Sequence, residues 1–214
     1  MWKESSGLLT LVLGGVLFGQ VEVLDLTKRV LLPDRWWGVV GDSFLSGTEP
    51  VPPLDLSLIL PQEVYRFDDE FVFEVAIKNI TGVPFPIPWE PDWTKIVPEE
   101  RPDRLPEGYC SAALFLNAGP AEQKVNLVAF GLEGSEEVGG SIRVLAPGET
   151  VRIRAKGNWS RLTRSVQTDL SPVKVSLWAE WVYFYGMRQT LAATEGVQWE
   201  TGACSEPQEV TVEP

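Results

Sequence analysis

The run VKVSLWAEWVYFY at residues 173–185 constrains the fold of this chain more than any other feature. Its odd positions, from Val173 to Tyr183, carry an unbroken row of apolar side chains. Because successive side chains point to opposite faces of a β-strand, this pattern predicts one long strand with its odd face toward a core.

Shorter runs with the same period of two recur along the chain. LDLSLIL at 54–60 and FVFEVAIKN at 71–79 alternate most regularly. No amphipathic helix is evident between the runs, and the segment 98–108 has too many prolines to hold one. About seven or eight short strands with turn signals between them predict an all-β fold, an antiparallel β-sandwich with long loops and an N-terminal arm. The remaining candidate strands are 111–117, 124–130, 141–145, 149–155 and 208–213.

A resemblance to a known type of domain rests on two stretches, YRFDDEFVFEVAIKNITGVPFPIP at 65–88 and LAPGETVRI at 145–153. Together they resemble the bacterial extracytoplasmic immunoglobulin-like domain, in which an acidic turn precedes a strand ending in Asn, a proline-laden edge follows, and a PGE turn leads into a later strand. The intracellular proteinase inhibitor domain has a similar outline. The resemblance covers roughly residues 54–212, although the chain has longer loops than the type needs. It implies an immunoglobulin-like sandwich with a binding or scaffold role and no catalytic residues to carry over.

The composition excludes several functions. The formal net charge is −12, and Lys and Arg form no cluster, which argues against nucleic acid and anionic membrane surfaces as partners. The chain has no histidine, which excludes a Ser-His-Asp triad, a Cys-His pair and histidine-ligated zinc. We therefore expect no enzymatic activity, no cofactor and no metal site.

The N-terminal residues allow three interpretations. An apolar run at 8–18 follows Lys3 and suits a signal peptide or anchor over residues 1–20. The same region also reads as a hairpin about Gly14-Gly15, or as a buried helix. Residues 21–53 then form an arm or linker, and residues 54–214 form the β-sandwich domain.

The stretch PFPIPWEPDW at 84–93 is the first candidate for a binding surface. Alternate prolines predict an edge strand, because proline cannot donate to a sheet ladder. They leave unexplained the two carboxylates between two tryptophans, and this grouping suits either a protein-docking edge or a sugar site. The candidate residues are Trp89, Glu90, Asp92 and Trp93, with Trp89 expected inward and Trp93 at the rim.

The second candidate is the even face of the long strand, which carries Trp178, Val182 and Phe184. Either another part of the chain covers this face, or it is an exposed apolar patch for a partner. The acidic run at 68–70 is interpreted as a polar turn, with a calcium site as the alternative.

The two cysteines, Cys110 and Cys204, are too far apart in sequence for a local metal or redox motif. We expect them to form one disulfide in an oxidising compartment, and the alternative is two separate buried thiols.

These features predict a non-enzymatic, extracytoplasmic β-sandwich that acts through a protein partner or self-assembly, as a structural subunit of a cell-surface or filamentous assembly. The alternatives are a carbohydrate-binding module that uses Trp89 and Trp93 to bind a glycan and, on outline alone, a proteinase inhibitor.

Overall fold

The structure is a computed structural model that describes residues 21–29, 53–97, 106–119, 124–159, 162, 172–185 and 198–214. These residues form strands and one short 3₁₀ helix, η3 (Trp93–Lys95), so the all-β prediction is confirmed. The strands are β1 (Val23–Asp25), β2 (Leu54–Ile59), β3 (Val64–Arg66), β4 (Phe71–Asn79), β5 (Phe85–Pro88), β6 (Cys110–Ala118), β7 (Val125–Gly134), β8 (Ile142–Leu145), β9 (Thr150–Gly157), β10 (Val173–Tyr185), β11 (Gln198–Cys204) and β12 (Gln208–Glu213).

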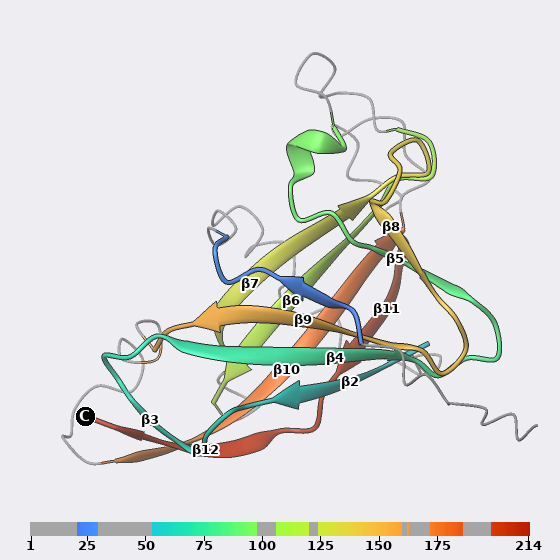
Figure 1. The fold of residues 1–214 in the computed structure, drawn as a ribbon. Coiled ribbons are helices and arrows are strands. Elements are labelled where there is room, and N and C mark those ends of the chain that lie inside the picture. Colours follow the sequence, from blue (N-terminus) through green and yellow to red (C-terminus); the bar gives the residue numbers. More distant parts are fainter. Residues whose placement is uncertain are drawn as a thin grey trace, which may run out of the picture.

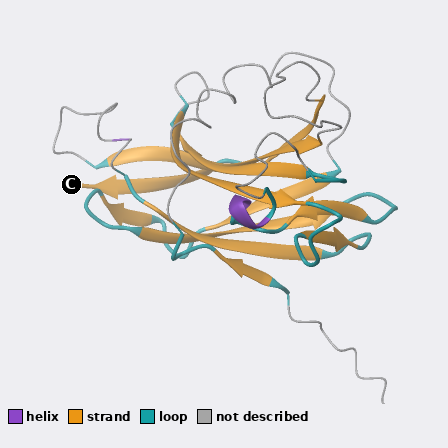
Figure 2. Cartoon of the chain, turned by 90° about the horizontal axis from the view of Figure 1, so that it is seen from above, coloured by secondary structure: helices purple, strands orange, loops and turns teal. Residues whose placement is uncertain are grey.

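Two sheets make up the body of the fold (Figure 1). Sheet A has the strand order β1-β9-β4-β2, and sheet B has the order β3-β12-β10-β6-β7, with β11 also paired to β10. A separate two-stranded ribbon joins β5 to β8. The strands of sheet A run across the front of the molecule in Figure 1, and those of sheet B cross behind them. Seen from above, in Figure 2, the strands lie in layers.

The main core lies between the two sheets. In β2, Leu54, Leu56 and Leu58 are buried while Asp55 and Ser57 are exposed, as the alternation predicts. Every residue of β6 is buried, so both faces of this strand are covered, and its two edges pair with β7 and β10. The same cluster of buried residues contains members of both sheets, which is the arrangement of a β-sandwich.

Aromatic rings fill one end of this core. Phe71 stacks on Trp159 with ring centroids 4.7 Å apart, and Tyr65 tilts against the same indole at 5.5 Å. Gly157 makes room for this group, because a Cβ atom there would lie 2.7 Å from Cζ of Phe71.

The long strand β10 is the centre of sheet B. One side pairs with β6, and the other side pairs with β12 and then β11, which lie end to end along it. Ser205 joins the two partners, because its backbone N–H donates to the Ala179 carbonyl and its Oγ accepts from the Ala179 N–H, both at 2.9 Å. The predicted strand at 173–185 is therefore confirmed over its whole length.

The structure corrects the prediction in two respects. The sheets are mixed, because β1 pairs with β9 and β3 pairs with β12 in parallel. The described residues also contain more strands than predicted, since β1, β3 and β11 show no clear alternation. Two of these are only three residues long and owe their conformation to the longer strand beside them.

The predicted signal peptide or anchor at 1–20, and its hairpin alternative, lie outside the described residues. Within the part of the chain that the structure describes, no helix is long and apolar enough to cross a membrane.

Candidate functional site

The N-terminal segment, defined here as residues 21–29, docks on the edge of sheet A. Its strand β1 lies parallel to β9, with Val23 opposite Arg152 and Asp25 opposite Arg154. Two backbone hydrogen bonds extend the pairing at its ends. The Arg152 N–H donates to the Glu22 carbonyl at 2.9 Å, and the Leu26 N–H donates to the Arg154 carbonyl at 2.8 Å. The segment is thus held as an added edge strand.

Leu26 anchors the C-terminal end of this segment. Its side chain is 1% exposed and belongs to the main core, and Leu24 packs partly buried beside it. The chain then turns, because Oδ1 of Asp25 accepts from the Thr27 N–H at 2.9 Å and from its hydroxyl at 2.7 Å. Both bonds lower the pKa of the Asp25 carboxyl, and the bond from the Thr27 hydroxyl has the larger effect.

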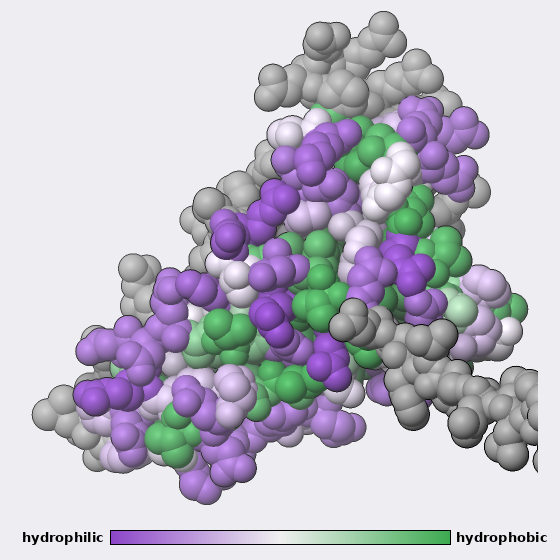
Figure 3. Space-filling model, in the orientation of Figure 1, coloured by the Kyte–Doolittle hydropathy of each residue, from purple (hydrophilic) through white to green (hydrophobic). Residues whose placement is uncertain are grey.

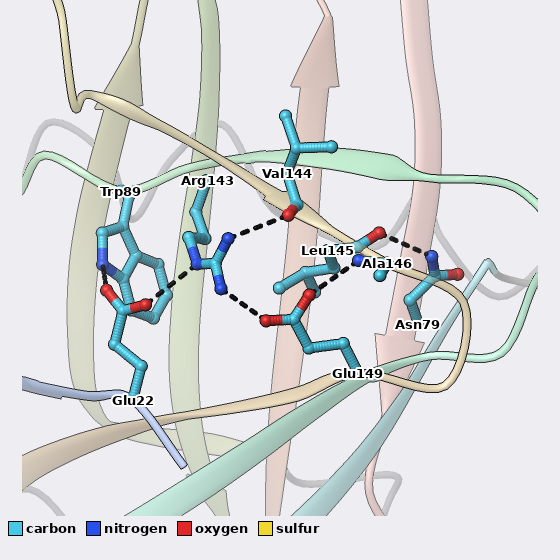
Figure 4. A network of polar contacts seen from close by, with 8 residues as sticks. All are labelled: Glu22, Asn79, Trp89, Arg143, Val144, Leu145, Ala146 and Glu149. Carbon is cyan, nitrogen blue, oxygen red and sulfur yellow. Dashed lines mark hydrogen bonds and ion pairs between the residues drawn. The ribbon is translucent and has the colours of Figure 1, made fainter. Parts of the chain in front are cut away.

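Glu22 anchors the other end, as Figure 4 shows. One carboxylate oxygen accepts from the indole N–H of Trp89 at 3.2 Å, and the other accepts from Nε of Arg143 at 2.9 Å. Glu22, Leu24 and Leu26 share the inward face of the strand, because they are two residues apart. The segment is therefore recognised by a charged contact, a backbone ladder and an apolar plug.

The cation of this contact is positioned by the turn between β8 and β9. The guanidinium of Arg143 also bonds to Glu149 and donates to the Val144 carbonyl at 3.0 Å. Glu149 in turn accepts from the Ala146 N–H at 2.7 Å, across a turn whose Gly148 has a φ of +76°. Glycine suits this left-handed conformation. The PGE turn noted in the sequence thus orients the residue that binds Glu22.

Asn79, at the end of β4, secures the same turn from below (Figure 4). This side chain is fully buried, and its Nδ2 donates to the carbonyls of Leu145 at 2.9 Å and Val83 at 2.8 Å. The bonds fix the end of β8 relative to β4. We call the docking surface the seat, and define it as the edge of β9 at 152–154 together with Trp89, Arg143 and the core site of Leu26.

The outer face of sheet A beside the seat is charged and mixed in sign. Glu74 on β4 forms ion pairs with Arg152 at 3.3 Å and Arg154 at 2.6 Å. Apolar side chains such as Val72 lie between the charges, so polar and apolar surface alternate in Figure 3. In this view the face presents no single large apolar patch, which leaves the strand edge as its more specific feature.

The predicted site at Trp89–Trp93 is divided by the structure. Trp89 is only 9% exposed and uses its N–H on Glu22, so its inward orientation is as expected and its ring cannot serve as an open stacking platform. Glu90 forms an ion pair with Lys95 at 3.1 Å. Trp93 begins η3, but its side chain lies outside what the structure describes.

Asp92 has a local structural role. Its Oδ1 accepts from the Thr94 hydroxyl at 2.7 Å, and this bond lowers the pKa of the carboxyl. The Asp92 N–H itself donates to Oε1 of Glu90 at 2.9 Å. The two carboxylates that stood out in the sequence thus stabilise the turn that leads into η3.

The even face of β10 is exposed at Lys174, near the start of the strand, and is covered at Glu180 and Val182. Val182 is fully buried and Trp178 is half-buried, while the side chain of Phe184 lies outside the described set. Glu180 on the same face accepts from Nδ2 of Asn117 at 2.9 Å and forms an ion pair with Lys124. Because Val182 is buried, it cannot belong to the exposed apolar patch that the sequence suggested for Trp178, Val182 and Phe184.

The predicted disulfide is absent, because β10 separates the two cysteines. Cys110 on β6 lies opposite Tyr185, whereas Cys204 on β11 lies opposite Glu180 on the other side of β10. Two strand spacings alone amount to about 10 Å, which exceeds the Cα separation that a disulfide can bridge. Cys110 is buried, and burial raises the pKa of its thiol to about 11, whereas Cys204 is exposed.

The acidic residues of the described ranges form no group of three or more potential metal ligands. The run at 68–70 is exposed and forms a turn before β4, with the Asp69 N–H donating to the Arg66 carbonyl at 3.1 Å. Among the described residues the most buried carboxylate is that of Glu133, which accepts from the Tyr109 hydroxyl. Burial, followed by the charge of Glu133, raises the pKa of Tyr109.

Sequence reasoning missed Glu22, Leu26 and Arg143, which carry the seat. The signal that could have found the first two is the spacing of Glu22, Leu24 and Leu26 before the polar residues 27–29. Arg143 gave no signal, because its role depends on β5 and β8 lying side by side.

Comparison with known proteins adds little to this geometry. No family model and no curated protein matches the chain. Similar solved structures include the sporulation control protein Spo0M of Bacillus subtilis, at 11% identity and a TM-score of 0.34 over 77% of this chain and 51% of that one. A β-glucosidase of Listeria innocua with bound glucose is 10% identical, with a TM-score of 0.34 over 77% of this chain and 16% of the glucosidase. A cross-linked adhesin of Mobiluncus mulieris is 11% identical, with a TM-score of 0.35 over 76% of this chain and 57% of the adhesin.

The chain thus spans about half the length of the sporulation control protein and of the adhesin, and a sixth of the glucosidase. Similarity this low carries no functional argument, so any functional conclusion has to come from the geometry of the chain itself.

Proposed function

We propose that this chain is a non-enzymatic β-sandwich that acts through protein–protein interaction, by adding a β-strand to the edge of sheet A. The observation that carries the proposal is the seat, where a peptide segment is held by Glu22, by Leu26 and by the backbone ladder between them. Strand addition to a sheet edge is a common mode of peptide recognition, in which the ladder gives affinity and the side-chain contacts give specificity.

The outer edge of β1 supports the same conclusion. Because backbone groups point alternately to the two sides of a strand, the N–H and C=O of Val23 face away from β9. Among the described strands, β1 is the outermost strand on its side of sheet A, so none of them pairs with its outer edge. Val21 and Val23 are 41% and 43% exposed beside it. An unpaired edge with apolar side chains is a template for a further strand.

The proposal assigns no catalytic role to the buried carboxylates. Glu133 bonds to Tyr109, and Glu180 bonds to Asn117 and pairs with Lys124, which are contacts that stabilise a fold. Trp89 offers no open stacking surface to a glycan, because its ring is buried. No observation in the described residues favours a proteinase inhibitor.

We further propose that the protein works outside the cytoplasm, as a structural subunit of a surface or filamentous assembly. The apolar run at 8–18 after Lys3 supports an extracytoplasmic location, and strand addition supports a structural subunit, since it links separate chains through backbone hydrogen bonds.

A peptide-binding experiment tests the seat. The test uses the full chain with Leu26→Asp. This substitution removes the apolar side chain that anchors the chain's own segment, and it alters no residue of the seat. We expect a fluorescently labelled peptide of residues 21–29 to bind this variant saturably in an anisotropy titration. The wild-type chain should bind the peptide far more weakly, because its seat is filled.

A matched peptide with Leu26→Asp provides the control and should not bind. If the variant keeps a cooperative melt and does not bind the native peptide, or if it binds both peptides equally, the seat is not a recognition site and the proposal is wrong.

A further inference from the structure

We propose that the seat exchanges between molecules, so that the N-terminal segment of one copy docks on the seat of a second copy of this chain. This inference rests on the proposed function and names its partner. It follows from the contacts of the segment, the length of chain behind it and the placement of the two surfaces.

The contacts that hold the segment do not depend on chain connectivity. Glu22 bonds to Trp89 and Arg143, and the backbone pairs with β9. Leu26 packs into a core built from strands that begin at residue 54 or later. Every one of these partners lies on the far side of residues 30–52 in the sequence. The segment of a second copy would therefore make the same contacts, and exchange would cost no contact free energy.

The connection is much longer than docking within one molecule requires. β1 and β2 lie at opposite edges of sheet A, three strand spacings or about 14 Å apart. Residues 30–53 join the docked segment to β2 and can span up to about 80 Å when extended. A domain of this size is about 40 Å across, so the connection is long enough to reach the seat of a neighbouring molecule.

The segment and the seat are different surfaces, so each copy gives one and receives one. Such an interface is heterologous, and it propagates into chains unless the rotation between copies closes it. A pair that exchanges segments reciprocally is the smallest closed form. Both forms use the same contacts and differ only in the path of the connection.

Concentration decides between docking within one molecule and docking between molecules. For short flexible linkers in general, the effective concentration of the tethered segment is in the millimolar range. Exchange is therefore expected when the protein is crowded, as it is within an assembly. The experiment accordingly compares dilute protein with protein at about 1 mM.

Engineered cysteines at one registered pair test the exchange directly. Val23 and Arg152 face each other across β1 and β9, at the separation of adjacent strands that suits a disulfide. One chain carries Val23→Cys and a second carries Arg152→Cys, each with Cys204→Ser to remove the exposed native thiol. In an oxidised mixture of the two, a disulfide between the two introduced cysteines can form only between molecules.

We expect a covalent heterodimer on a non-reducing gel, with a yield that rises with concentration. A chain carrying both Val23→Cys and Arg152→Cys should give dimers and higher species. The control pairs Val23→Cys with Lys78→Cys, which is exposed on the same face of sheet A but lies beyond β9, and it should give only background.

The outcomes separate this inference from the proposed function. If the double-cysteine chain closes only an internal bond, the mixture gives no heterodimer at about 1 mM, and the labelled peptide still binds, the partner is not a second copy and the proposed function stands. If no bond forms in any sample, the segment is not on the seat and both proposals fail.

Discussion

Replacing Leu26 with Ala should destabilise the whole sandwich, although the residue lies outside the domain predicted from the sequence. The side chain is 1% exposed, so the substitution removes roughly three buried carbon groups at about 0.8 kcal/mol each. A cavity left in the core raises the cost of a Leu→Ala change to about 2–5 kcal/mol. Leu26 also borders a surface groove with Phe130 and Lys156, which lets the site relax. We therefore expect a loss of about 2–3 kcal/mol.

Urea denaturation followed by tryptophan fluorescence measures this loss. For a cooperative unit of this size, the change corresponds to a fall in Tm of about 5–10 °C. Val23→Ala is the matched control on the same strand. Its side chain is 43% exposed, and its removal should cost less than about 0.5 kcal/mol.

Equal stabilities of the Leu26→Ala and Val23→Ala chains would refute the reasoning. That result would mean that Leu26 is not buried in solution and that the segment does not occupy the seat. A drop in the m-value of the Leu26→Ala chain would instead mean that the segment unfolds separately from the sandwich.

Three further predictions concern single side chains. Thiol titration should find two thiols in the denatured, unreduced protein and one fast-reacting thiol in the native protein, because Cys204 is exposed while burial raises the pKa of Cys110 to about 11. Burial raises the pKa of Tyr109, so its neutral form stabilises the fold fully below about pH 10, and stability should fall above that pH as the unfolded chain ionises. In an alkaline absorbance titration the Tyr109 phenolate should therefore appear only on unfolding, so the wild type and Tyr109→Phe should share one titration curve while both are folded, and an extra phenolate in the folded wild type would contradict this. Gly157→Ala should lower stability by about 1–3 kcal/mol in urea denaturation, because the new methyl would lie 2.7 Å from the ring of Phe71, and an unchanged midpoint would contradict the packing.

The strands of the two sheets were predictable because their side chains alternate along the sequence. β2 and β4 each bury one face, and β10 carries apolar side chains at every odd position up to Tyr183, so the apolar residues of these strands repeat every second position. The turn before β9 was predictable for a related reason, since Pro147, Gly148 and Glu149 suit one local geometry. In these segments, the local sequence carries most of the information.

Strand order and register were decided only by the tertiary structure. The cysteines failed to pair because β10 lies between β6 and β11, and nothing near Cys110 or Cys204 encodes that order. The parallel docking of β1 was equally invisible, because three residues carry too little pattern to specify a strand.

The candidate site shows the same division. The sequence by itself determined an acidic, histidine-free chain with alternating strands and with two carboxylates between Trp89 and Trp93. The tertiary structure decided that Trp89 turns inward and that its N–H meets Glu22, a residue 67 positions away. The reason is physical. Alternation along a strand fixes which side chains share a face, but which face meets which depends on contacts between segments that are distant in the sequence.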